Sequence, residues 1–273
     1  NEFKRMYELK KKQQEQAYEK QQKEIAHLQD FIARNKARAA TATLARSRQR
    51  KLEKMDIITT TSEKMKPIFS FQSARTTGKV VIDAKNLIIG YDEPLTRILD
   101  FQVERNQKIA IKGVNGLGKS TLLKTLLGIV KPIQGTIELD QFVKVGYFEQ
   151  EVVSSSKTAL QEIWDKYPSM TNGEVRSALA KCGLTTEHIT TQMKVLSGGE
   201  NAKVRLCDLM LQEYNLLVFD EPTNHLDVDA KDSLKEAIKK FKGTVLLVSH
   251  EPEFYNDIAT DIWNLESWST KIV

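Results

Sequence analysis

The chain has 273 residues, of which 28% are charged and 40% are hydrophobic, and its formal net charge is +5. This length allows one large domain or two small ones. No apolar run approaches the roughly 18 residues of a membrane span, and no charged-then-apolar leader opens the chain. Two cysteines, Cys182 and Cys207, are too few for a disulfide framework. We therefore expect a cytoplasmic protein with no direct membrane insertion.

The basic residues gather near the N-terminal end. Residues 1–66 hold 17 of the 41 Lys and Arg residues but only 9 of the 36 Asp and Glu residues. Within that range, residues 31–54 carry eight basic residues and one acid, Glu53. Such a patch is typical of a protein that binds a polyanion. A solvated, charged helix surface is the alternative, but the asymmetry favours the patch.

The same N-terminal range has the pattern of two helices. Residues 2–33 lack Gly and Pro and are rich in good helix formers. Four apolar residues follow the narrow stripe of a coiled-coil seam: Tyr18, Ile25, Leu28 and Ile32. A second helix is predicted at about 43–55, with a small, basic tip at 35–41. We expect residues 1–66 to form a basic helical hairpin, a projecting arm that a connecting segment at 67–78 joins to the next domain. Because the chain begins without Met, we expect a fragment of something longer.

The periodicity changes from residue 79 onward. Val80, Ile82, Leu87 and Ile89 suggest strands, and Lys108–Lys112 is predicted to be a short buried strand. Strand, loop and helix then alternate as far as the apolar run at 245–248. This alternation predicts an α/β fold, a sheet covered by helices, over residues 79–273.

A glycine-rich loop follows the predicted strand at 108–112. Residues 113–120 read Gly-Val-Asn-Gly-Leu-Gly-Lys-Ser, the P-loop pattern, and a helix is predicted directly after them. Glycines let backbone N–H groups surround phosphates, and the helix N-terminus adds its positive dipole. We assign Lys119 to the β- and γ-phosphates and Ser120 to Mg²⁺. The nucleotide contacts predicted here are Gly113, Asn115, Gly116, Gly118, Lys119, Ser120 and Thr121.

Two adjacent acids, Asp220 and Glu221, directly follow another apolar strand predicted at 216–219. Asp220 is predicted to hold Mg²⁺, directly or through water. Glu221 is predicted to lie near the γ-phosphate as a general base or water-orienting group. Adjacent acids after a strand are common in loops, so the P-loop is what makes this pair informative.

Further motifs resemble the ABC superfamily of ATPases. Leu196-Ser-Gly-Gly-Glu200 is similar to the ABC signature motif, which in that family touches the nucleotide of the opposite domain and so implies roles for Ser197, Gly198 and Gly199. The resemblance implies that Gln150 senses Mg²⁺ and the attacking water, that His250 contacts the γ-phosphate, and that Asp227 lies at the dimer seam. Tyr91 resembles the aromatic residue that stacks on adenine. His225 is given no chemistry, and His27 and His188 are interpreted as ordinary residues.

The wording Glu221-Pro-Thr-Asn-His-Leu-Asp227 resembles the ABC-F subfamily, because transporter subunits usually have Ser-Ala in place of Asn224-His225. Residues 46–55 resemble the second helix of the ABC-F interdomain linker. This resemblance implies a P-loop ATP-binding domain with a helical subdomain, the cofactors ATP and Mg²⁺, and a ribosome partner (rRNA and tRNA) reached through the arm. It also implies that each site is completed by a missing N-terminal ATP-binding domain or by a second copy paired head to tail.

Three other readings stay open. A transporter ATPase subunit shares the nucleotide motifs but explains neither the basic hairpin nor Asn224-His225. A DNA-repair ATPase of the structural-maintenance type would place its coiled coil between P-loop and signature. A non-enzymatic scaffold conflicts with the presence of Lys119, Asp220 and Glu221. The sequence does not decide between general translation and antibiotic resistance.

Overall fold

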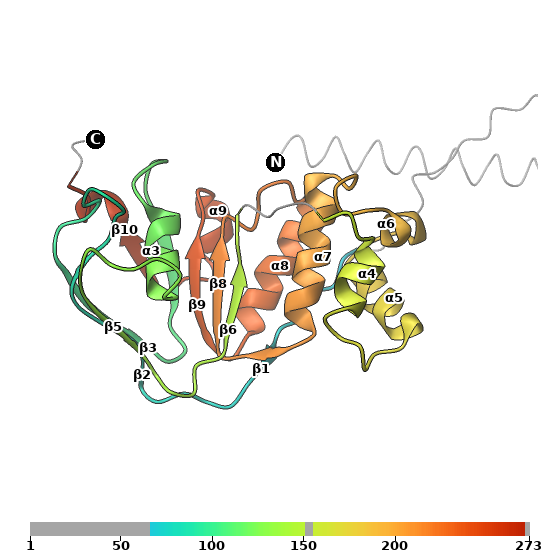
Figure 1. The fold of residues 1–273 in the computed structure, drawn as a ribbon, viewed down its shortest axis with the longest axis horizontal. Helices are drawn as coiled ribbons and strands as arrows, with labels where there is room; N and C mark the ends of the chain where they lie inside the picture. Colours follow the sequence, from blue (N-terminus) through green and yellow to red (C-terminus); the bar gives the residue numbers. More distant parts are fainter. Residues whose placement is uncertain (1–65, 151–154, 271–273) are drawn as a thin grey trace, which may run out of the picture. The chain divides into compact units, whose positions relative to one another are not determined.

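The computed structural model describes residues 66–150 and 155–270. The chain divides into two compact units, Asn1–Lys64 and Met65–Val273, and the described residues belong to the second. The predicted helical hairpin at 1–66, apart from Lys66, and with it the coiled-coil stripe and the basic tip, lies outside the described residues. The fold below is therefore that of the second unit (Figure 1).

A five-stranded parallel sheet forms the centre of this unit, in the order β10-β4-β9-β8-β6. Its strands are β4 (Lys108–Lys112), β6 (Val145–Phe148), β8 (Leu216–Asp220), β9 (Thr244–Val248) and β10 (Asp261–Asn264). Every residue of β8 and β9 is buried. Near-continuous apolar runs of this kind are typical of parallel strands that are covered on both faces. The predicted strands at 108–112, 216–219 and 245–248 are confirmed.

A smaller antiparallel sheet lies beside the first. It has the order β3-β2-β5, formed by β2 (Val80–Ile88), β3 (Leu99–Glu104) and β5 (Gln134–Leu139). Helix α3 (Lys119–Leu126) lies between the two sheets (Figure 1). Its Leu122, Leu123 and Leu126 are fully buried in a core shared by both sheets. This packing holds the start of α3, which follows the P-loop, directly above the strands.

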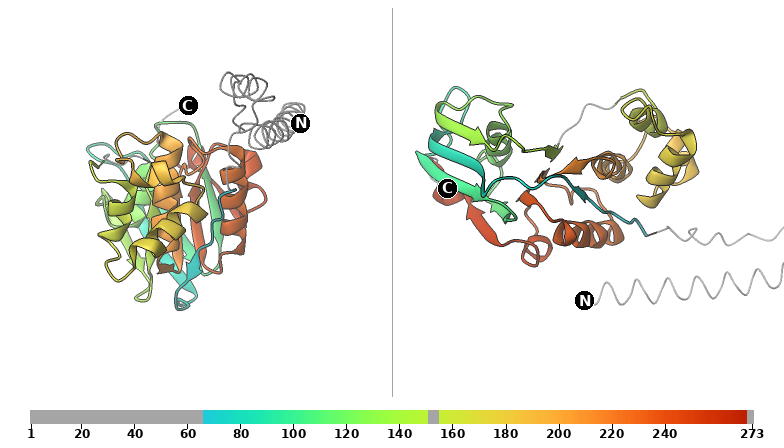
Figure 2. Two further views of the ribbon diagram at one scale, coloured as in Figure 1. Left: turned by 90° about the vertical axis from the view of Figure 1, so that its right-hand side faces the viewer. Right: turned by 90° about the horizontal axis from the view of Figure 1, so that it is seen from below.

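The opposite face of the parallel sheet carries the other helices. Helices α7 (Gly198–Met210) and α8 (Val228–Lys240) share a second core with Leu217 and Phe219 of β8. Beyond them lie α4 (Ala159–Trp164), α5 (Asn172–Lys181) and α6 (Thr186–Thr190), grouped at one end of the unit (Figure 2). The mixed α/β class with a helical portion is as predicted.

Short elements complete the unit. They are β1 (Gln72–Ser73), β7 (Glu213–Tyr214), α9 (Pro252–Tyr255) and the 3₁₀ helix η1 (Leu265–Ser267). β1 pairs with β7, Phe69 is buried, and the Phe69 backbone N–H donates to Ser233 Oγ at 3.0 Å. The segment at 67–78 thus contributes its own strand and a core side chain to the second unit.

Candidate nucleotide-binding site

The P-loop lies between β4 and α3, as its sequence context predicts. Gly118 adopts the left-handed conformation (φ 91°) at the N-cap of α3, where an added Cβ would meet Leu95 at 2.8 Å. Gly116 is also left-handed (φ 81°), and nothing lies within 4 Å of the position its Cβ would take. A loop with this backbone leaves open space at its crest and turns directly into a helix N-terminus, the arrangement that binds phosphates.

Lys119 is folded back onto the loop that it follows. Its ammonium group donates to the carbonyl oxygens of Gly113 and Val114, both at 3.1 Å, and to Asn115 Oδ1 at 3.4 Å. Burial lowers the pKa of Lys119, while the carboxylates of Glu221 and Asp220 oppose that shift. A partly buried ammonium held only by neutral oxygens is well placed to exchange those contacts for a phosphate anion.

Asp220 ends β8 beside the start of α3. It is 1% exposed, and neither carboxylate oxygen has a hydrogen-bond partner within the described ranges. Burial raises the pKa of Asp220, and the Ser120 hydroxyl acts in the opposite direction. Orphaned, buried carboxylate oxygens next to a hydroxyl fit an oxygen-binding cation such as Mg²⁺. In the part of the chain that the structure describes, no group of three or more His, Cys, Asp and Glu residues could hold a metal. A P-loop site requires only this hydroxyl and carboxylate, since phosphate oxygens and water supply the remaining ligands.

Glu221 is the meeting point of the predicted catalytic residues. Its Oε1 lies 3.1 Å from His250 Nε2, and its Oε2 accepts hydrogen bonds from Gln150 Nε2 at 3.4 Å and Asn224 Nδ2 at 2.7 Å. Its backbone is left-handed (φ 50°), an uncommon conformation for a residue other than Gly. The backbone N–H of Glu221 donates to Val248 O at 3.0 Å. This hydrogen bond ties the Glu221 backbone to the end of the neighbouring strand β9. The fold thus assembles Gln150, Glu221 and His250 at one place, as a group of functional residues requires.

The signature motif forms the N-terminus of α7. Ser197 is the N-cap, and its side chain and that of Glu200 form a capping box. A Cβ at Gly199 would come within 2.4 Å of His225 O, and one at Gly198 within 2.9 Å of His225 Cγ. The small signature residues therefore let His225, itself left-handed at φ 68°, pack directly against the helix.

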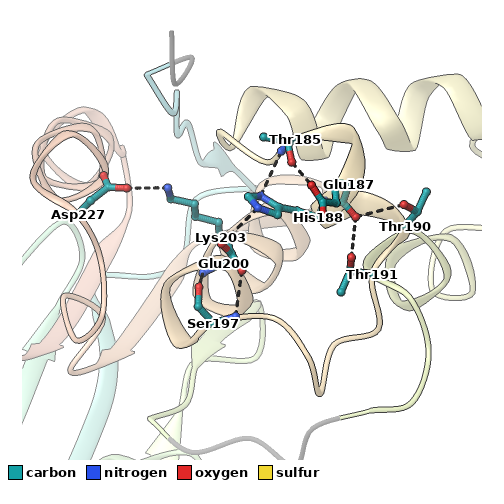
Figure 3. A network of polar contacts seen from close by, with 9 residues as sticks. All are labelled: Thr185, Glu187, His188, Thr190, Thr191, Ser197, Glu200, Lys203 and Asp227. Carbon is teal, nitrogen blue, oxygen red and sulfur yellow. Dashed lines mark hydrogen bonds and ion pairs between the residues drawn. The ribbon is translucent and has the colours of Figure 1, made fainter. Parts of the chain in front are cut away.

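Asp227 connects the same two segments. It caps α8 by accepting from the Ala230 N–H at 2.9 Å, and it pairs with Lys203 of α7 at 2.8 Å (Figure 3). Lys203 is buried, so this ion pair is shielded from solvent on the lysine side. The segment after β8 and the signature helix are thereby held as one surface.

The remaining predicted contacts are placed less closely. The Tyr91 side chain is 65% exposed, and its stacking on adenine stays a prediction. Thr121 is buried in the first turn of α3, where its carbonyl accepts from Thr125 Oγ1 at 2.7 Å. No hydrogen bond or ion pair among the described residues joins Ser197, Gly198 or Gly199 to the P-loop. The role of the signature residues in nucleotide binding stays a prediction.

Sequence reasoning missed three contacts of this surface. The sequence indicates Asn224 and His225 only as marks of the ABC-F subfamily. In the structure Asn224 contacts Glu221, and His225 contacts the signature glycines. Lys203 was not singled out, although it pairs with Asp227. The strict spacing within 221–227 was the available signal for the first two. Lys203 gave no comparable signal, because its partner is 24 residues away.

Comparisons with known proteins indicate the family of the chain. A family model described as ABC transporter matches residues 96–224, and a second model of the same description matches residues 1–71. The uncharacterized ABC transporter ATP-binding protein YfmM of Bacillus subtilis is 57% identical over 274 residues, covering 100% of this chain and 53% of that protein. ABC transporter F family member 5 of Arabidopsis thaliana is 36% identical over 263 residues, covering 93% of this chain and 38% of that protein. The chain thus spans about half or less of these relatives.

A solved structure shows the same relationship. A putative ABC transporter ATP-binding protein from Pyrococcus furiosus aligns with a TM-score of 0.57 at 25% identity, covering 69% of this chain and 99% of that one. Within the described ranges, no helix is long and apolar enough to cross a membrane. The family models and the similar proteins together show that the chain belongs to the family of ABC transporter ATP-binding domains.

Proposed function

We propose that this chain is the ATP-hydrolysing part of an ABC-F protein that acts on the ribosome. The observation that carries the proposal is the use made of Asn224 and His225. Asn224 Nδ2 holds Glu221 at 2.7 Å, and His225 packs against Gly198 and Gly199. The Ser-Ala pair that transporter subunits usually have in place of Asn224-His225 has neither a side-chain amide nor a ring for these contacts. The named F-family relative agrees with this assignment.

The hydrolytic step is assigned to Glu221. With ATP bound in the P-loop, Lys119 would contact the β- and γ-phosphates, and Ser120 and Asp220 would hold Mg²⁺, which would supply positive charge to the phosphate oxygens. The Glu221 carboxylate orients the attacking water and accepts its proton. Asn224 and Gln150 donate to that carboxylate and fix its rotamer, and we assign the γ-phosphate contact to His250. These residues act by position and charge rather than by covalent chemistry.

A second ATP-binding domain completes each site in this proposal. Ser197 is exposed at the N-terminus of α7, and it has no nucleotide partner within its own chain. A helix N-terminus favours an anion, so the signature would meet the phosphates of a nucleotide bound by another domain. That domain is either a segment absent from this chain or a second copy paired head to tail.

The ribosome is assigned as partner from charge. The basic residues of 31–54 match a phosphate backbone, and a cytoplasmic ATPase with such an arm has RNA as its most abundant polyanion.

Co-sedimentation with purified ribosomes tests the proposal. The Glu221→Gln variant should be used with Mg-ATP, so that the nucleotide-bound state persists, and salt should be varied from low to physiological concentration. Binding that requires ATP and falls steeply with salt is the expected result. ATP hydrolysis without ribosome binding at any salt concentration would instead favour a transporter-type ATPase subunit.

A further inference from the structure

Helix α6 places a histidine against the signature motif (Figure 3). Thr185 caps this helix, and its backbone N–H donates to His188 Nδ1 at 3.4 Å. In the neutral form of this ring, the nitrogen that accepts the hydrogen bond, Nδ1, carries no proton, and the N–H group is at Nε2. The hydrogen bond from Thr185 thus orients the ring with Nε2 away from its own helix.

The Nε2 atom lies beside an acid of the signature motif. His188 Nε2 lies 3.3 Å from Glu200 Oε1, and the other oxygen, Oε2, accepts from the Ser197 backbone N–H at 2.9 Å. Both side chains are about 30% exposed, at 30% for His188 and 29% for Glu200. The two oxygens of Glu200 therefore contact two different elements, His188 of α6 and the N-cap residue Ser197 of α7.

The surroundings keep Glu200 ionised for this task. Burial would raise the pKa of Glu200, but the hydrogen bonds from Ser197 and the positive charge of the nearby Lys203 hold it below its usual range. An ionised carboxylate accepts stronger hydrogen bonds than a protonated one. Without His188, the glutamate would have one oriented oxygen rather than two, and more rotamers would be open to it.

We propose that His188 is a positioning residue for the signature motif: through Glu200 it fixes the backbone of Ser197 in the conformation that meets a nucleotide held by a second ATP-binding domain. This inference rests on the proposed function for its consequence, but the contact from His188 to Ser197 can be tested separately. In this proposal His188 acts only through its contact with Glu200. Its effect is confined to the signature half-site and does not reach the P-loop of its own chain.

The first measurement is the exchange rate of the Ser197 amide, followed by NMR in this chain without nucleotide. His188→Leu should make this amide exchange roughly three- to tenfold faster, because one supported hydrogen bond is weakened. His188→Gln, whose amide can still donate to Glu200, should restore most of the protection. In a Glu200→Ala background, His188→Leu should have no further effect. An unchanged Ser197 exchange rate in His188→Leu overturns the proposal.

Thr190→Ala is the matched control, because Thr190 lies on the same helix and, within the described ranges, its hydroxyl bonds only to the carbonyls of Thr186 and Glu187 in α6. It should leave the Ser197 amide unchanged. Faster exchange in this control as well would mean that any loosening of α6 produces the effect, and it would overturn the specific role of His188.

The second measurement separates the two half-sites. His188→Leu should lower ATP turnover roughly tenfold, as misplacement of a positioning group does, while ATP affinity stays within about twofold of the parent. Equal turnover in variant and parent would make the contact structural only and would overturn the proposal. If the parent itself hydrolyses no ATP, the proposed function fails, and the exchange rates still decide whether His188 positions Ser197.

Discussion

Glu221 Oε1 and His250 Nε2 lie 3.1 Å apart across the ends of β8 and β9. These strands are neighbours in the sheet, with Asp220 opposite Val248 in the register. Parallel pairing therefore sets two residues that are 29 positions apart in the sequence at the same edge. The position of this pair follows from the register of the buried strands rather than from contacts on the surface.

Glu221→Gln should abolish most turnover and preserve ATP binding. The amide cannot accept the proton of the attacking water, whereas the contacts from Lys119, Ser120 and Asp220 to the nucleotide and Mg²⁺ are untouched. Loss of a general base costs roughly 10²–10⁴-fold in rate. Single-turnover hydrolysis and equilibrium nucleotide binding measure the two effects. Unchanged turnover would show that Glu221 is not the general base.

The Glu221→Gln variant should also favour pairing of two chains. We expect ATP that is bound but not hydrolysed to bridge the P-loop of one copy and the signature of the other, because no hydrogen bond among the described residues joins Ser197 or Gly199 to the P-loop of the same chain. Sedimentation velocity with and without Mg-ATP measures this directly. A concentration-independent monomer under both conditions would contradict self-pairing and would leave a separate ATP-binding domain as the partner.

Asp220→Asn should stabilise the nucleotide-free protein at neutral pH. Because burial raises the folded-state pKa of Asp220, the folded state pays for ionising it. That penalty is absent below the unfolded-state pKa, develops as pH rises through the folded-state pKa, and is complete above it. The gain in unfolding free energy over the parent should therefore grow with pH. One pKa unit corresponds to about 1.4 kcal/mol.

Urea unfolding across a pH series measures this difference. Asp165→Asn is the control, since the Asp165 carboxylate is exposed and pairs with Lys157, and it should show no such gain. Mg²⁺ added with ATP should stabilise the parent further but not Asp220→Asn, because the variant lacks an anionic oxygen ligand. Equal stabilisation of both by Mg²⁺ would remove Asp220 from the metal site.

Two glycines at helix N-termini give opposite expectations. Gly199→Ala should destabilise the protein by about 1–3 kcal/mol, because its Cβ would lie 2.4 Å from His225 O and the backbone must shift. Gly173→Ala in α5 meets nothing within 4 Å and should stabilise by roughly 0.5–1 kcal/mol through helix propensity. Thermal unfolding compares them. Equal effects would mean that the packing of His225 on α7 places no demand on this glycine.

The sequence predicted what depends on local pattern. The buried strands β4, β8 and β9 and the loop from Gly113 to Ser120 are visible as apolar runs and glycine spacing. It did not predict β1 or the burial of Phe69, because Pro67 and the threonines at 59–61 are typical of a linker and the partners of the segment are distant. His188 was interpreted as ordinary for the same reason. Its role depends on Glu200, which reaches it only when α6 packs beside α7.

The basic arm gives the last prediction. Arg34, Lys36, Arg38 and Arg46 lie among residues 31–52, where no acid occurs. If these side chains neutralise RNA phosphates, counterion release gives a log–log salt slope of about −0.7 to −0.9 per contact. Replacing all four by Ala should weaken ribosome binding and flatten that slope.

Arginine also binds phosphate with two N–H groups or stacks on a base, so replacing the three arginines by Lys should retain the slope but recover only part of the affinity. ATP affinity is the internal control, because the P-loop residues that bind nucleotide are unchanged. A quadruple variant that binds ribosomes like the parent at every salt concentration would show that the charge of the arm is solvated surface, and the ribosome would lose its main support as the partner.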